Sequence, residues 1–227
     1  MTNLVFVAGL IVGAILYPVC DYAAMRLDRY LMSNRRFRGW FVERVVRFHL
    51  SKMKRMNVRV LNNVLLPSDG RTTFTEIDHI VVSSRGIFCI ETKSHKGKVK
   101  GSGNDANWVQ FLGGKSYQFA NPIRQNRTHI KAIEAVLAAW SLPIVVHSVV
   151  VFPAAWKVEI RDTANVIKSA RELRELISNF QDEILSSEHQ AQSMKALNEA
   201  NRSDRKRQNK HRKEVGKLFK SSETHHE

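Results

Sequence analysis

Cysteines and acidic residues are scarce in this chain of 227 residues. The two cysteines, Cys20 and Cys89, support neither a disulfide framework nor a four-ligand zinc site, and they favour a reducing, cytoplasmic setting for the soluble part. Asp and Glu number 21 against 36 Lys and Arg, which leaves a formal net charge of +15. This excess favours an anionic polymer or an anionic lipid surface as partner, with a solvated basic surface as the alternative.

Charged side chains are also absent from the first twenty residues, and residues 4–19 are almost wholly apolar. About 20 helical residues span roughly 30 Å, the thickness of the hydrocarbon core of a bilayer. We therefore predict a single transmembrane anchor in residues 1–25. Arginines are frequent in the following basic juxtamembrane segment, residues 26–38. The positive-inside rule then places the C-terminal domain in the cytoplasm and the anchor in the inner (cytoplasmic) membrane.

Other interpretations of the apolar start are less well matched. A cleaved signal peptide requires basic residues before the apolar run and small residues at a cleavage point, and neither is found. A lipoprotein site at Cys20 lacks the small residue expected just before the cysteine. A buried or peripheral helix is an alternative to the membrane span. Gly9 and Gly13 form a Gly-x-x-x-Gly pair, from which we predict a homodimer through packing of two spans.

Apolar spacing predicts the elements of the remaining chain. The helical period of apolar residues predicts a helix over Trp40–Met53. Apolar runs bounded by turn residues predict strands at 58–66, 76–83, 87–93 and 145–152, and short edge strands at 97–101 and 115–119. Asn121-Pro122 and a capping box from Ser169 to Glu172 predict the starts of two further helices, the second of which reaches Phe180. This order predicts an α/β fold with a mixed central β-sheet flanked by helices.

The composition changes again towards the C-terminus, where the chain becomes polar and basic. We predict one folded domain over residues 39–185 and a basic tail, helical or disordered, over residues 186–227. The tail is either a solvated segment or a secondary contact for nucleic acid or lipid headgroups.

Two carboxylates and a lysine are spaced as a metal site requires. Asp78 lies in the second predicted strand and Glu91 near the end of the third, so antiparallel pairing would bring them together. Lys93 faces the same side as Glu91 because the two are two residues apart. Two carboxylates can hold Mg²⁺ while waters and a phosphate complete its coordination shell, and a nearby ammonium can orient water or stabilise phosphate charge. The pattern D-x(12)-E-x-K is short and also occurs by chance.

Other polar residues near these motifs are assigned from their pattern. Glu43 shares the apolar side of the first predicted helix, where the pattern alone favours a solvated edge residue. Strand alternation sends His79 to the face opposite Asp78, which predicts a structural role. His129 receives no functional role, and Trp108 is predicted to pack rather than to stack on bases.

Several separated motifs occur in an order that is similar to a known family. Residues 75–82 and 86–93, then Gly97, Trp108 and residues 121–125 resemble the nuclease-related domain family, a branch of the PD-(D/E)xK nuclease superfamily. The resemblance covers roughly residues 39–152 and implies a restriction-endonuclease-like core. The chain shows no helicase, kinase or zinc-finger region, and Gly-x(4)-Gly-Lys-[Ser/Thr] is absent, so no ATP-driven step is predicted.

The resemblance implies a role for five residues. It assigns metal binding to Asp78 and Glu91 and places Lys93 beside the scissile phosphate. It also gives Glu43 a place in the metal shell or a role in orienting water. Gln125, on the first turns of the next predicted helix, would contact phosphate or water, with an exposed helical glutamine as the alternative.

These observations predict a membrane-anchored, Mg²⁺-dependent nuclease that hydrolyses phosphodiester bonds of DNA or RNA, with Mn²⁺ as the alternative metal. The main alternative is a non-catalytic, membrane-tethered protein that binds nucleic acid or acts as a scaffold. A third hypothesis assigns the basic segments to anionic lipid and the domain to protein interactions. The sequence leaves open whether the substrate is single or double stranded.

Overall fold

The computed structural model describes residues 33–53, 57–68, 73–163, 165–180 and 185–203, together with Arg26 and Glu214. The predicted anchor in residues 1–25 and the Gly9/Gly13 pair lie outside the described residues. Within them, no helix combines the length and the apolar character of a membrane span. The chain divides into two compact units, Met1–Phe41 and Val42–Glu227, and both sheets and the site described below belong to the second.

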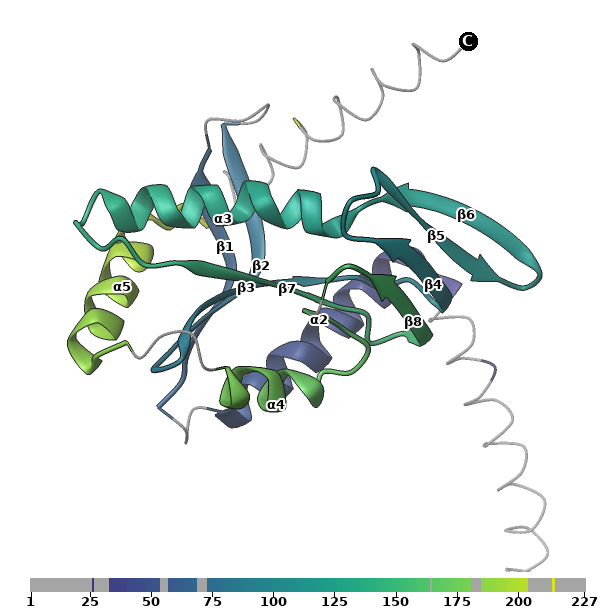
Figure 1. The fold of residues 1–227 in the computed structure, drawn as a ribbon, viewed down its shortest axis with the longest axis horizontal. Helices are drawn as coiled ribbons and strands as arrows, with labels where there is room; N and C mark the ends of the chain where they lie inside the picture. Colours follow the sequence, from purple (N-terminus) through teal and green to yellow (C-terminus); the bar gives the residue numbers. More distant parts are fainter. Residues whose placement is uncertain are drawn as a thin grey trace, which may run out of the picture. The chain divides into compact units, whose positions relative to one another are not determined.

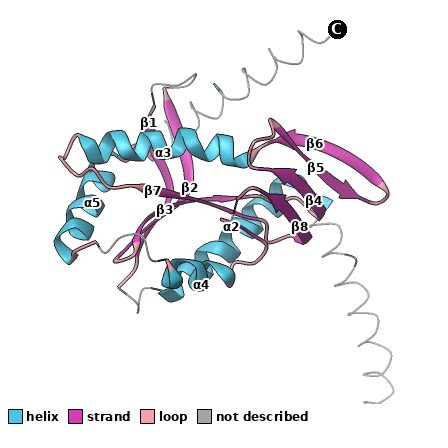
Figure 2. Cartoon of the chain, viewed as in Figure 1, coloured by secondary structure: helices cyan, strands magenta, loops and turns pink. Residues whose placement is uncertain are grey.

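The first sheet has five strands in the order β1-β2-β3-β7-β9 (Figure 2). Its strands are β1 (Arg59–Pro67), β2 (Phe74–Ser83), β3 (Gly86–Thr92), β7 (Val146–Val151) and β9 (Val166–Ile167). The first three strands pair in antiparallel fashion, whereas β3 with β7 and β7 with β9 are parallel, so the sheet is mixed. Every residue of β3 is buried, as expected for a central apolar strand covered on both faces.

Helices cover both faces of this sheet (Figure 1). Ile133 and Leu137 of α3 (Pro122–Ala138) and Leu197 of α5 (Ser187–Ala200) lie in one core cluster with strand residues. Leu50 of α2 (Arg35–Lys52) and Leu173 of α4 (Glu172–Asn179) lie in a second cluster with residues of β2, β3 and β7. The result is a mixed α/β architecture. Helix α5 belongs to the segment that the sequence assigns to the tail, and its Leu197 is fully buried.

The helix starts follow the sequence only in part. As predicted, the Asn121 side chain accepts a hydrogen bond from the Ile123 N–H, and Pro122 is the first residue of α3. The prediction that a capping box at Ser169 starts the next helix is wrong, because α4 begins only at Glu172. The Ser169 hydroxyl accepts from the Arg171 N–H instead, two residues further on, which makes a turn rather than a helix cap.

A second, four-stranded sheet replaces the predicted single central sheet with two. Its order is β6-β5-β4-β8, with β4 (Gly97–Ser102), β5 (Asn107–Leu112), β6 (Lys115–Ala120) and β8 (Ala155–Arg161). It is also mixed, since β4 and β8 are parallel whereas the β4–β5 and β5–β6 pairs are antiparallel. Trp108 is fully buried, as predicted, and donates from Nε1 to the Ser102 carbonyl at 2.8 Å. Gly101 permits this packing, because a Cβ there would lie 2.3 Å from Trp108 Cδ1.

Candidate active site

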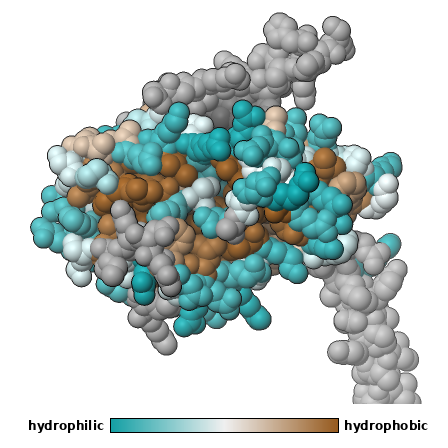
Figure 3. Space-filling view, viewed as in Figure 1, coloured by the Kyte–Doolittle hydropathy of each residue, from teal (hydrophilic) through white to brown (hydrophobic). Residues whose placement is uncertain are grey.

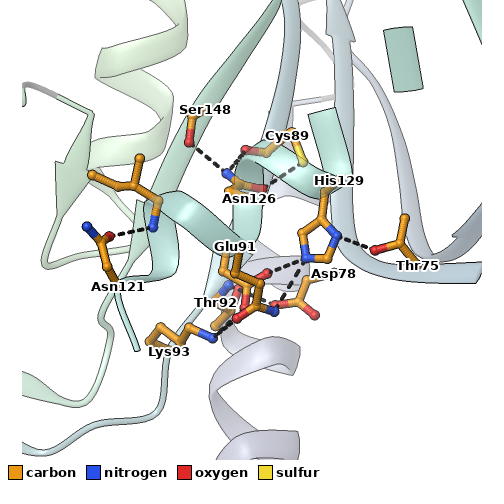
Figure 4. A network of polar contacts seen from close by, with 12 residues as sticks. Thr75, Asp78, Cys89, Glu91, Thr92, Lys93, Asn121, Asn126, His129 and Ser148 are labelled. Carbon is orange, nitrogen blue, oxygen red and sulfur yellow. Dashed lines mark hydrogen bonds and ion pairs between the residues drawn. The ribbon is translucent and has the colours of Figure 1, made fainter. Parts of the chain in front are cut away.

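The pairing of β2 with β3 brings Asp78 and Glu91 together. Their antiparallel register runs from Ser83 opposite Gly86 to His79 opposite Ile90, and the next step places Asp78 opposite Glu91. At this point the Asp78 carboxylate accepts a hydrogen bond from the Thr92 N–H at 2.8 Å (Figure 4). The two acids therefore lie at the open end of the hairpin.

Strand β2 changes face at Asp78. Ile77 and Ile80 are three positions apart, which regular alternation would place on opposite faces, yet both pack in the core cluster that contains residues of α3. On β1, Asn63 lies between the residues paired with His79 and Ile77 and therefore faces Asp78, and it has a positive φ of 53°. Asparagine tolerates this conformation better than most residues. Arg47 of α2 donates to the Asn63 side chain and so ties this irregular position of β1 to the helix.

Glu91 is held from both sides. Lys93 Nζ lies 2.7 Å from Glu91 Oε1, and His129 Nε2 lies 3.3 Å from Glu91 Oε2 (Figure 4). Lys93 also donates to Gln125 Oε1 at 2.7 Å, and His129 Nδ1 lies 2.6 Å from the Thr75 hydroxyl. One connected network thus joins the end of β3 to the first turns of α3 and to β2. It contains three of the five predicted site residues.

The two acids have opposite pKa shifts. Burial raises the pKa of Asp78 well above its ordinary value, and the charges of Glu91 and Glu43 raise it further. Burial also acts to raise the pKa of Glu91, but Lys93 and His129 outweigh it and lower that pKa to about 2. Glu91 is therefore ionised at neutral pH, while Asp78 retains a proton more readily. The carboxyl groups of Asp78, Glu91 and Glu43 outnumber the lysine that pairs with Glu91, so a bound cation would favour the ionised form of Asp78.

Glu43 lies on α2, half-buried, on the same side as Val46 and Leu50, which pack in the core. Its charge raises the pKa of Asp78, so the helix does bring it into electrostatic range of the strand acids. Among the described residues, however, no three acidic, histidine or cysteine side chains converge as a group that could hold a metal ion. Asp78 and Glu91 still fit Mg²⁺, because this ion needs only one or two carboxylates and retains several waters.

His129 was missed by the sequence interpretation although its spacing offered a signal. It lies four residues after Gln125, and residues four apart share one face of a helix. The contact between Gln125 Nε2 and His129 Nε2 measures 3.4 Å. His129 is 5% exposed, and its two ring nitrogens face Glu91 and Thr75. It therefore belongs to the site as a side chain that orients Glu91.

Asn126 is a second residue that the sequence did not single out. It is fully buried, and its amide donates to the Cys89 carbonyl at 2.9 Å and to the Ser148 hydroxyl at 2.8 Å (Figure 4). The Cys89 thiol in turn donates to the side-chain oxygen of Asn126 at 2.9 Å. These bonds fasten the first turns of α3 to β3 and β7. No local pattern signals them, because every partner is distant in sequence.

His79 has the structural role that strand alternation predicts. It is fully buried, and its Nδ1 lies 2.7 Å from the Asn62 side-chain oxygen. Burial, with a smaller effect from Arg47, lowers the pKa of His79 to about 3. The imidazole is therefore neutral at physiological pH, and its hydrogen bond goes to Asn62 rather than to the acids.

Comparisons with known proteins identify relatives of the segment that carries this site. A family model described as a nuclease-related domain matches residues 38–153, just over half of the chain. An uncharacterized protein of Bacillus anthracis is 35% identical over 130 residues, which cover 57% of this chain and 58% of that protein. The match thus spans less than two thirds of this relative. No solved structure matches the chain. All residues of the acid network lie within the matched segment.

Proposed function

The chain belongs to the nuclease-related domain family, and on this premise we propose that it is a metal-dependent nuclease that hydrolyses phosphodiester bonds of DNA or RNA. The observation that carries the proposal is the connected network in which ionised Glu91 contacts Lys93 and His129 beside Asp78. A buried excess of carboxylates next to a lysine suits a cation and a phosphate together.

Asp78 and Glu91 would hold the metal, which we propose to be Mg²⁺ or, alternatively, Mn²⁺. When bound, such an ion supplies Lewis-acid stabilisation of phosphate charge and lowers the pKa of a coordinated water. The donor set fits, since hard divalent cations prefer carboxylate oxygens. Glu43, in electrostatic range of Asp78, would act through a water rather than as a third direct ligand.

The residues of the chain have separable roles in this proposal. Lys93, anchored by Glu91 and Gln125, presents an ammonium that can donate to a phosphate oxygen or orient the attacking water. Gln125 lies on the first turn of α3, where the positive end of the helix favours an anion. His129 fixes the second oxygen of Glu91 and thereby its orientation.

We further propose that residues 1–25 anchor the enzyme in the inner (cytoplasmic) membrane as a single span with the nuclease domain in the cytoplasm. The support is the uncharged apolar start followed by arginines. Packing of two spans through Gly9 and Gly13 would make a homodimer. Protease digestion of spheroplasts tests the orientation, because the domain should be protected until the membrane is opened.

The nuclease activity is tested with the full-length chain on DNA and RNA substrates in Mg²⁺, in Mn²⁺ and in excess chelator. We expect cleavage with metal, none in chelator, and loss of cleavage in Asp78→Ala and Lys93→Ala. Glu134→Ala and Lys131→Ala, at exposed positions of α3, are the matched controls. Equal cleavage by the site variants and the wild type would refute the assignment, and salt-sensitive binding without cleavage would favour the non-catalytic alternative.

A further inference from the structure

A groove of about 640 Å³ opens on the second sheet, apart from the acid network. It lies between the start of β4, the β5–β6 turn and the start of β8. Its walls combine three lysines with three large apolar side chains: Lys96, Lys98, Lys115, Phe111, Leu112 and Trp156. The surface on the side of the second sheet mixes hydrophilic and hydrophobic residues in this view (Figure 3). Basic and aromatic side chains together are typical of surfaces that bind single-stranded nucleic acid.

A β-bulge presents the tryptophan of this groove. Gly97 pairs with Ala155 and the next residue, Lys98, pairs with Lys157, so Trp156 is the extra residue of β8. Regular alternation would turn Lys157 inward after buried Ala155, but the bulge leaves both Trp156 and Lys157 exposed. Trp156 is 66% exposed, the largest fraction among the large hydrophobic residues that the structure describes. Bulges commonly re-aim side chains beside functional sites.

The charge of the surface selects an anionic partner. Glu159 forms ion pairs with three lysines, at 2.7 Å to Lys157, 3.0 Å to Lys98 and 3.5 Å to Lys100. One carboxylate cannot neutralise three ammonium groups, and Lys96 and Lys115 add two more positive charges at the groove. A partner with phosphates for the lysines and planar bases for the aromatic rings satisfies both features. A duplex keeps its bases stacked inside and would leave the rings without partners.

The groove is close to the acid network along the chain. Lys93 and Lys96 are three residues apart, a distance of at most about 11 Å in a fully extended chain. A nucleic acid strand lying in the groove could therefore continue to Lys93 and Glu91 within about three nucleotides, since stacked nucleotides of one strand rise about 3.4 Å each.

We propose that this groove binds single-stranded nucleic acid, with a base stacked on Trp156 and phosphates at Lys96 and Lys115, and that it directs single strands to the acid network. The second part rests on the proposed nuclease function, whereas the first part does not. The groove would thus make single-stranded DNA or RNA, rather than duplex, the substrate class of the enzyme.

The test measures binding of a fluorescein-labelled oligothymidylate to the full-length chain in excess chelator, so that cleavage does not interfere. We expect Trp156→Ala to weaken binding about tenfold, within the range measured for base stacking on aromatic side chains. Lys115→Gln should weaken binding and reduce the salt dependence by roughly 0.7 in the logarithmic slope, the value for one phosphate contact on a single strand. A duplex of the same length should compete poorly.

Trp140→Ala and Lys131→Gln serve as controls, because both residues lie on or just after α3 and are at least partly exposed. Equal losses in Trp156→Ala and Trp140→Ala would overturn the proposal, as would equal competition by duplex or binding to anionic vesicles that the oligonucleotide does not compete. If the groove variants lose binding but Asp78→Ala cleaves like wild type, the groove stands and the nuclease assignment at Asp78 fails. If Asp78→Ala is inactive but the groove variants bind normally, the reverse holds.

Discussion

The two sheets each contain a glutamate whose pKa is lowered to about 2, and the two are lowered against different backgrounds. Glu91, in the first sheet, is 4% exposed, and burial opposes its ionisation until Lys93 and His129 outweigh it. Glu159, in the second sheet, is partly exposed, with a side chain 33% accessible, and hydrogen bonds from Lys157 and Lys98 lower its pKa against a smaller opposing effect of burial. The two glutamates therefore reach a similar pKa for different reasons: Glu91 against the cost of burial, and Glu159 mainly through hydrogen bonds from lysines.

The difference lies in which charge is in excess. In the first sheet, the charges of Glu91 and Glu43 both raise the pKa of Asp78, and Lys93 is the lysine that pairs with Glu91. Around Glu159, three lysines share one carboxylate. A buried excess of acid suits a small cation, and an exposed excess of lysine beside aromatic rings suits a polyanion. The same chemical substitution should consequently have opposite effects in the two sheets.

The largest effect is expected for Glu91→Gln. The amide removes the charge that pairs with Lys93 and that, in the proposed function, would bind the metal. We expect the cleavage rate to fall by about 100-fold or more, the scale seen when a charge-stabilising group is lost. Initial rates at saturating Mg²⁺ measure it. Glu134→Gln on α3 is the matched glutamate control, and a Glu91→Gln enzyme as active as this control would abolish the contrast between the sheets.

His129→Gln should have an intermediate effect. Glutamine keeps a hydrogen-bonding group but not the two ring nitrogens that join Thr75 to Glu91. Loss of such a supporting contact costs about 10–100-fold in metal affinity or activity. Titration with Mn²⁺, followed by electron paramagnetic resonance, measures the metal affinity separately from the activity. A positioning role for His129 predicts weaker metal binding and partial recovery of activity at high metal concentration. Unchanged Mn²⁺ affinity would contradict this role.

Asp78→Asn should stabilise the metal-free protein while it abolishes cleavage. The pKa of Asp78 is raised in the folded state, so its contribution to stability is present at acid pH and is lost as the pH rises through the folded pKa. Asparagine can still accept from the Thr92 N–H but carries no charge. We expect a gain of about 1–2 kcal/mol in unfolding free energy at about pH 8 and a smaller gain at about pH 5. Thermal unfolding at both pH values checks it, and a gain that does not grow with pH would contradict it.

The smallest effect is expected for Glu159→Gln. Removing the carboxylate releases Lys98, Lys100 and Lys157 from their shared partner. We expect oligothymidylate to bind about twofold more tightly at low salt, because one exposed charge has a modest, screened effect. Fluorescence anisotropy at two salt concentrations measures it. Weaker binding than in the Glu134→Gln control would show that the lysine surface does not face the nucleic acid.

The elements that could be predicted from sequence are those whose burial leaves a local pattern. Strands β1, β2, β3 and β7 are apolar runs, and each was located to within about two residues. Strands β5, β8 and β9 were not identified, because β5 and β8 are partly exposed and mix polar with apolar residues, and β9 has two residues. The capping box at Ser169 failed because its motif is short and the chain formed a turn there instead.

The site divides in the same way. Asp78, Glu91 and Lys93 could be found because their spacing follows from strand alternation and a short turn, and Gln125 followed from the family pattern. His129 could be placed on the face of Gln125, but its contact with Glu91 depends on where α3 crosses the sheet. The bulge at Trp156 depends on pairing with β4, a strand more than fifty residues earlier in the chain, and such pairing leaves no trace in the local sequence.

Asn126 gives the position of α3 a functional meaning. The residue before it, Gln125, touches Lys93, and the residue three positions after it, His129, touches Glu91. One buried amide therefore sets how far two site residues stand from the strand that carries the acid and the lysine. Substitutions on the exposed side of α3 should leave the site unchanged. A shift of the helix by a fraction of a hydrogen-bond length would change both contacts at once. The geometry of the candidate site is, in that sense, a helix-to-sheet spacing maintained by a residue outside the acid network.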